Sequence, residues 1–109
     1  MKILHLTAPA QATLQEIIKY TIEIFGVQQA KRYQQQLITT TEKLCNSQFP
    51  LGRDCSFLLK YDSDTSKFLY IREGMHYLIY TETSEHIVLH DFVHVSRDLP
   101  ALLDTIKHR

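Results

Sequence analysis

Three arginines and two histidines in the second half of the chain have side chains suited to a charged partner: Arg53, Arg72, His76, His94 and Arg97. Arginine binds carboxylates and phosphates through parallel hydrogen bonds, and histidine exchanges a proton near neutral pH. Arg72 and His76 flank a predicted turn, and Arg97 directly precedes Asp98. Arg72, His76, Arg97 and Asp98 could together form a binding site for an anionic group of a partner. Alternatively, an internal Arg97–Asp98 or Arg–Glu73 arrangement could hold the C-terminal turn, with Asp98 capping a helix. Arg53 could serve equally as a loop anchor or as a surface contact.

The six histidines of the chain raise the question of a metal site. His86, His90 and His94 share one parity on a predicted strand, but residues four apart in a strand are roughly 13 Å apart. Zinc needs all its nitrogen ligands at about 2.0–2.1 Å from one ion. We therefore predict no metal and no cofactor. Cys45 and Cys55 stand outside any C-x-x-C motif, and we expect two small buried thiols rather than a disulfide.

The first half of the chain predicts a short strand followed by two helices. Residues 1–6 are apolar enough for a strand, and Thr7 with Pro9 is typical of a helix entry. Apolar residues then recur at helical spacing on both sides of Gly26, which we expect to be a left-handed helix stop. Core positions are expected at Leu14, Ile18 and Ile22 in the first helix and at Val27, Ala30 and Leu37 in the second, with Phe25 on the first stripe. The threonine run 39–41 is expected to weaken the second helix.

The second half predicts an antiparallel meander and a final helix. Strands are expected at residues 57–61, 67–72, 75–81 and 86–95, and Asp98-Leu99-Pro100 opens the last helix. The order β-α-α-β-β-β-β-α indicates an α+β fold, with the helical hairpin packed on one face of an antiparallel sheet. In the last strand the odd positions are expected to meet the helices. The even positions are expected to form an amphipathic partner surface.

Composition excludes several classes of protein. The chain has 109 residues, which is one domain by size, and its 12 basic and 12 acidic residues cancel. A protein that binds nucleic acid through its phosphates is usually basic, so sequence-specific nucleic-acid binding is not expected. No segment is long and apolar enough for a membrane span or a signal peptide, which predicts a cytoplasmic protein. For the aromatic series 68, 70, 77, 80 and 92, cross-strand packing is favoured over a base-stacking platform, because acidic residues lie nearby.

The second half of the chain contains three ordered motifs. The first is Pro50-Leu51-Gly52-Arg53, and the second runs from Phe68 through Arg72 and His76 to Tyr80. The third runs from Ile87 to Asp98 and includes His94 and Arg97. These motifs resemble those of the RelE/ParE superfamily of bacterial toxins, and of its ParE-like branch of plasmid stabilisation toxins in particular. Together with the strand–helix–helix start, the resemblance covers almost the whole chain. It implies a toxin that a cognate ParD-like antitoxin neutralises, with DNA gyrase as the target.

The RelE-like branch, which cuts messenger RNA in the ribosome, supplies an alternative that would use Arg72, His76 and Arg97. Such a nuclease needs cations beside the reacting phosphate. Residues 51–109 carry seven basic and nine acidic residues, and no tyrosine follows Arg97. This favours a toxin that binds a protein over an enzyme. The low basicity and the sequence His90-Asp91-Phe92 also depart from the ParE-like pattern, so an inactive paralogue that only binds antitoxin is a third hypothesis. The sequence leaves open whether the protein forms a homodimer.

Overall fold

A computed structural model describes residues 1–47, 51–55 and 68–108. The elements are β1 (Ile3–Leu6), α1 (Ala8–Phe25), α2 (Val27–Asn46), β2 (Arg53–Asp54), β3 (Leu69–Glu73), β4 (His76–Glu82), β5 (His86–His94) and α3 (Leu99–Lys107). The predicted α+β class and the order of its elements are confirmed. The strand expected at residues 57–61 lies outside the described residues, and the strand after the helices is β2.

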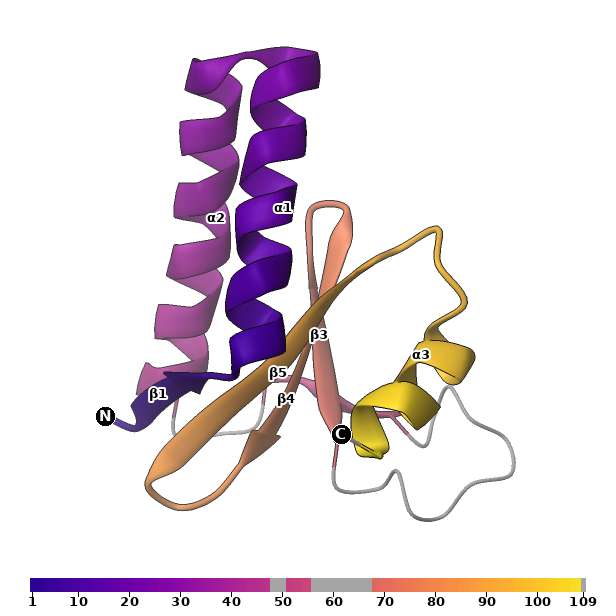
Figure 1. Ribbon diagram of the computed structural model, residues 1–109. Coiled ribbons are helices and arrows are strands. Elements are labelled where there is room, and N and C mark those ends of the chain that lie inside the picture. The colour runs from indigo at the N-terminus through magenta and orange to yellow at the C-terminus, as the bar shows by residue number, and fades with distance from the viewer. Residues whose placement is uncertain (48–50, 56–67, 109) are drawn as a thin grey trace.

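The helical hairpin forms where the sequence predicts it (Figure 1). Thr7 caps α1, with its hydroxyl accepting a hydrogen bond from the Ala10 amide at 3.2 Å. Gly26 ends α1 and begins α2 with φ +91° and ψ 169°. The prediction of a left-handed helical conformation at Gly26 is therefore wrong, because its ψ lies far from the left-handed helical value. Its positive φ still explains why glycine occupies this position. The threonine run does not interrupt α2, which continues to Asn46. The Thr41 hydroxyl donates to the Ile38 carbonyl at 2.7 Å, and that of Thr40 donates to Glu73.

The free end of the hairpin projects beyond the sheet (Figure 1). Ala30 and Leu37 of α2 are buried, as predicted. In α1 the buried apolar residues are Ala10 and Ile17, whereas the predicted core positions Leu14 and Ile18 are only half-buried. Three positions predicted as apolar stripe or core, Ile22, Phe25 and Val27, are instead 41%, 66% and 52% exposed. Helical periodicity marks the inner face of a helix along its whole length. The sheet covers only part of that length, so the apolar residues near Gly26 stay uncovered.

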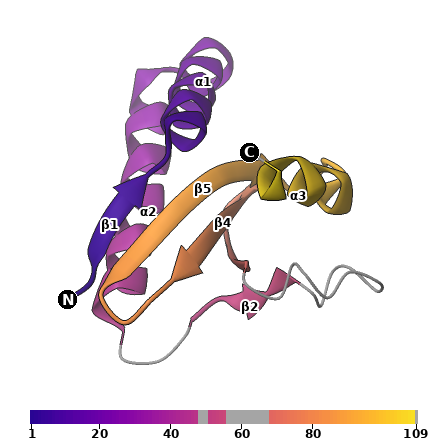
Figure 2. The same cartoon turned by 60° about the horizontal axis from the view of Figure 1, so that its bottom comes forward.

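The strands form one sheet in the order β1-β5-β4-β3-β2, in which β1 is parallel to β5 and the other neighbours are antiparallel. The α1–α2 hairpin covers one face and α3 lies against the other (Figure 2). On the hairpin side the core contains Leu37, Leu44, Leu78, Tyr80 and Ile87. On the other side Leu103 and Ile106 of α3 pack with Tyr70, Ile79 and Val93. Both cysteines are free and buried, as predicted.

An irregularity in β5 changes which of its side chains meet the helices. Tyr80 pairs with Leu89 and Ile79 pairs with Asp91, so His90 is an extra residue in the ladder. Leu89 belongs to the hairpin-side core, and after this bulge Phe92 belongs to it as well, whereas Val93 belongs to the α3 side. The expectation that odd positions face the helices is therefore correct up to Leu89 and wrong beyond it. One inserted residue exchanges the two faces because strand side chains alternate with period two.

Candidate functional site: a groove beside the last strand

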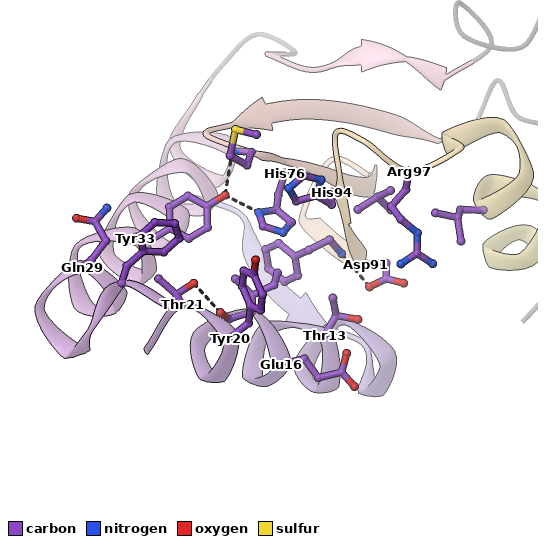
Figure 3. Close-up of a pocket in the computed structure, with 16 residues that line it drawn as sticks. Thr13, Glu16, Tyr20, Thr21, Gln29, Tyr33, His76, Asp91, His94 and Arg97 are labelled. Carbon is purple, nitrogen blue, oxygen red and sulfur yellow. Dashed lines mark hydrogen bonds between the residues drawn. The ribbon is translucent and has the colours of Figure 1, made fainter. Parts of the chain in front are cut away.

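A groove of about 750 Å³ lies between α1 and the second half of β5 (Figure 3). Its lining is mainly apolar, with a few polar groups at the rim. α1 and α2 contribute Thr13, Glu16, Ile17, Tyr20, Thr21, Phe25, Gln29 and Tyr33. The sheet side contributes Met75, His76, Asp91, Phe92, Val93, His94, Arg97 and Leu102. A half-open groove of this kind is suited to a peptide segment of a partner.

The groove reaches the edge of β5 rather than one of its faces. Pairing with β1 ends at Leu89, whereas β5 continues to His94. The four consecutive residues 91–94 all line the groove. Because side chains of consecutive strand residues point to opposite faces, a groove lined by all four must run along the strand edge.

A polar network joins α2 to the sheet at one end of the groove. The Tyr33 hydroxyl accepts a hydrogen bond from the Met75 amide at 3.2 Å, and it lies 3.1 Å from the Glu73 carbonyl and 2.5 Å from His76 Nδ1. The His76 ring meets the His94 ring edge to face, with centroids 5.2 Å apart, and His94 Nδ1 is 2.7 Å from the Ser96 hydroxyl. This network fixes the position of the β3–β4 turn against α2.

The His76 imidazole and the Tyr33 hydroxyl, which are hydrogen-bonded in this network, are both neutral near pH 7. Burial, with a smaller contribution from His94, lowers the pKa of His76 to about 4. Burial also raises the pKa of Tyr33. At neutral pH the Tyr33–His76 pair is therefore a hydrogen-bonding pair without charge. The strongest charges on the groove are those of Arg97, Glu16 and Asp91.

Asp91 is an acidic residue that is only 8% exposed. Its carboxylate accepts a hydrogen bond from the Phe92 amide at 2.9 Å. Arg97 lies beyond the end of β5 with an exposed side chain, and Figure 3 places its guanidinium on the same side of the groove as the Asp91 carboxylate. The groove thus has an exposed cation at the end where β5 finishes.

The structure brings together His76, His94 and Arg97 from the predicted residues, and it places Arg53 and Arg72 elsewhere. His76 pairs with Glu73 and His94, whereas Arg72 pairs with Tyr77 on the opposite face of the sheet. Arg72 donates instead to the Gly74 carbonyl at 3.0 Å.

Arg53 is exposed and pairs with Tyr70, also on the face opposite His76. The predicted cluster of Arg72, His76, Arg97 and Asp98 is therefore wrong. Asp98 instead caps α3, with its carboxylate accepting a hydrogen bond from the Ala101 amide, as the alternative prediction for this residue states. Alternation in the β3–β4 hairpin separates Arg72 from His76, since they stand four residues apart across a turn and are not partners in the ladder.

Sequence reasoning missed two features of this site. Tyr33 lies at helical spacing from Ala30 and Leu37 in the apolar stripe of α2, and the sequence contains no separate signal for a role of its hydroxyl. The open edge of β5 gave no signal either, because a local pattern does not show that the nine-residue β5 pairs with the four-residue β1.

Two further observations concern metals and membranes. Within the described residues, no three histidine, cysteine, aspartate or glutamate side chains gather closely enough to hold a metal ion. Among the same residues, no helix combines the length and the apolar character that a membrane crossing requires.

Comparisons with known proteins agree with this fold. A search of curated proteins found no match. A solved structure described as a chromosomal ParDE toxin–antitoxin system from P. aeruginosa matches with a TM-score of 0.68 at 16% identity, covering 88% of this chain and 98% of that one. At this identity the likeness concerns the fold. The family model of the ParE toxin of the parDE type II toxin–antitoxin system matches residues 4–99. The chain therefore belongs to the ParE toxin family of type II toxin–antitoxin systems.

Proposed function

We propose that this ParE-family toxin acts in the cytoplasm on DNA gyrase, and that a ParD-like antitoxin keeps it silent by occupying the groove beside β5. The observation that carries the antitoxin part is the groove itself. It combines exposed aromatic side chains, Tyr20 and Phe25, with an uncovered strand edge. Exposed apolar surface next to unpaired backbone is costly for a protein that stays alone, and it favours a protein partner.

A protein target is favoured over RNA by the positions of the charged residues. The nuclease alternative requires Arg72, His76 and Arg97 around one phosphate. Arg72 and His76 are on opposite faces of the sheet. With a pKa of about 4, His76 also carries no positive charge at neutral pH that could stabilise a developing phosphorane.

Induced expression of the protein, with and without the gene beside it, tests this proposal. Growth, the SOS response and protein synthesis are scored separately. We expect growth arrest with SOS induction and continuing translation, because gyrase poisoning breaks DNA, and we expect the neighbouring antitoxin to relieve it. Arrest with collapsed translation and no SOS response would instead identify the RelE-like activity. Folded protein without arrest would identify an inactive paralogue that binds antitoxin.

A further inference from the structure

His5 and His86 form a pair on neighbouring strands, outside the groove. β1 and β5 run parallel, with Ile3 opposite His86 and His5 opposite Val88, so the two histidines are diagonal neighbours on one face of the sheet. Their ring centroids are 5.0 Å apart, and His5 Nε2 lies 3.0 Å from His86 Nδ1. Histidines four apart within β5 are too distant to share an ion, whereas the pairing with β1 brings a different histidine next to His86.

The part of the face that carries this pair is open to solvent. Leu4 and Leu6 pack against the hairpin-side core, so His5 between them lies on the opposite face. α3, which lies against that face elsewhere, is at the far end of β5 from β1 (Figure 2). His5 is exposed and His86 is half-buried. A hydrated ion therefore has access to both rings.

The separation of the two ring nitrogens is close to that of two ligands of one ion. Zinc binds imidazole nitrogen at about 2.0–2.1 Å with tetrahedral geometry, which places two ligating nitrogens roughly 3.3–3.4 Å apart. The 3.0 Å between His5 Nε2 and His86 Nδ1 is shorter than this by roughly a few tenths of an ångström. Each ring also has to turn until its lone pair points at the ion rather than at the other ring. The exposed His5 side chain has room for this movement.

The proton balance of the pair permits an ion to take the place of the hydrogen bond. In the neutral pair one proton lies between His5 Nε2 and His86 Nδ1, because one nitrogen donates and the other accepts. When an ion enters, the ring that donated carries its proton on its outer nitrogen instead, and each ring keeps one N–H. No net proton is released, and both inner lone pairs become ligands. Neutral imidazole is the form in which histidine binds metals.

The lysine next to β1 does not oppose a cation at this pair. The Lys2 ammonium forms an ion pair with Glu82 at 2.7 Å. Glu82 is opposite Ile87, which belongs to the hairpin-side core. The charge of Lys2 is therefore neutralised on the other face of the sheet.

From these contacts we infer that His5 and His86 together bind one divalent transition ion such as Zn²⁺, with water in the remaining coordination positions, and that the ion fastens β1 to β5. Within the described residues no third histidine, cysteine or carboxylate side chain completes a larger site. Imidazole ligands suit Zn²⁺, Ni²⁺ and Cu²⁺, whereas Mg²⁺ and Ca²⁺ prefer oxygen ligands. This site is separate from the groove and does not depend on the proposed function.

Titration of the metal-free protein with zinc chloride tests the inference, with calorimetry measuring the affinity and nuclear magnetic resonance the location. We expect one ion per chain, ring signals of His5 and His86 that shift together, and no response to magnesium chloride. His5→Gln and His86→Gln should each weaken zinc binding by at least about tenfold, because even the loss of a group that orients a ligating histidine costs that much. Zinc should raise the Tm of the unmodified protein more than that of either variant, since the ion binds only where β1 is paired with β5.

The matched control is His108→Gln, which removes an exposed histidine that lies 3.4 Å from Asp104 on α3. This variant should bind zinc as the unmodified protein does. Absence of zinc binding to the unmodified protein would overturn the inference, as would binding that persists in both His5→Gln and His86→Gln or is lost in His108→Gln instead. Ring signals that shift at His5 without His86 would also overturn it, because a single histidine would then hold the ion. This last readout needs no substitution, so it decides the matter even where a variant does not fold.

Discussion

Replacing Leu103 with alanine is expected to lower the free energy of unfolding by about 3 kcal/mol, within the range for leucine-to-alanine changes in protein cores. Leu103 is 0% exposed and packs between α3 and the sheet, in a cluster with Tyr70, Ile79 and Val93. α3 is a nine-residue helix, so few neighbouring side chains can move to fill the space. A chain of this size has a total stability on the order of 5–15 kcal/mol, and the loss would be a substantial part of it.

The matched control is Leu102→Ala, on the same helix. Leu102 is half-buried at the groove, so we expect it to lose about 1 kcal/mol or less. Urea unfolding followed by circular dichroism measures both variants under the same conditions. At this chain length, 3 kcal/mol corresponds to a fall in Tm on the order of 10 °C. Equal losses in the two variants, or a loss below 1 kcal/mol for Leu103→Ala, would refute the assignment of Leu103 as the residue that holds α3 to the sheet.

Three further predictions concern the groove. In cells without the antitoxin, Arg97→Ala should relieve growth inhibition more than Arg53→Ala, because the ParE-like motif that contains Arg97, from Ile87 to Asp98, is much longer than the one that contains Arg53; wild-type toxicity in both variants would contradict this. Tyr20→Ala should weaken antitoxin binding at least about tenfold with an unchanged Tm, since Tyr20 is 60% exposed and lines the groove; calorimetric titration measures the binding. The pKa of His76 is about 4 in the fold against 6.5 for an ordinary histidine, so unfolding takes up a proton between these values. Stability should therefore fall as the pH drops from about 6.5 to about 4, by at most about 1.4 kcal/mol per pH unit, and His76→Gln should remove this part of the slope in urea unfolding.

Local signals in the sequence predicted the parts of the fold that depend on near neighbours. Thr7 and Asp98 cap their helices because a side-chain oxygen three residues before an amide can reach it within one turn. Gly26 separates two apolar stripes because the turn between them requires a positive φ. The β3–β4 turn at Gly74 follows from the same property, with φ +58°.

Exposure at the hairpin tip could not be predicted in this way. Ile22 and Val27 continue the apolar stripes of their helices, and periodicity alone assigns them to the core. Their exposure depends on the length of the sheet beneath the hairpin, which is a property of the assembled fold.

Sequence patterns were sufficient to predict the α+β class and the order of elements, and they singled out His76, His94 and Arg97 as candidate partner-binding residues. Which of the predicted residues meet depends on the assembled fold. The bulge at His90 exchanges the faces of β5, and the β3–β4 ladder sends Arg72 to the face opposite His76. The groove likewise exists because β1 ends at Leu6 while β5 continues to His94. Strand register and strand length are set by pairing between segments about 80 residues apart, and a local pattern contains no information on such pairs.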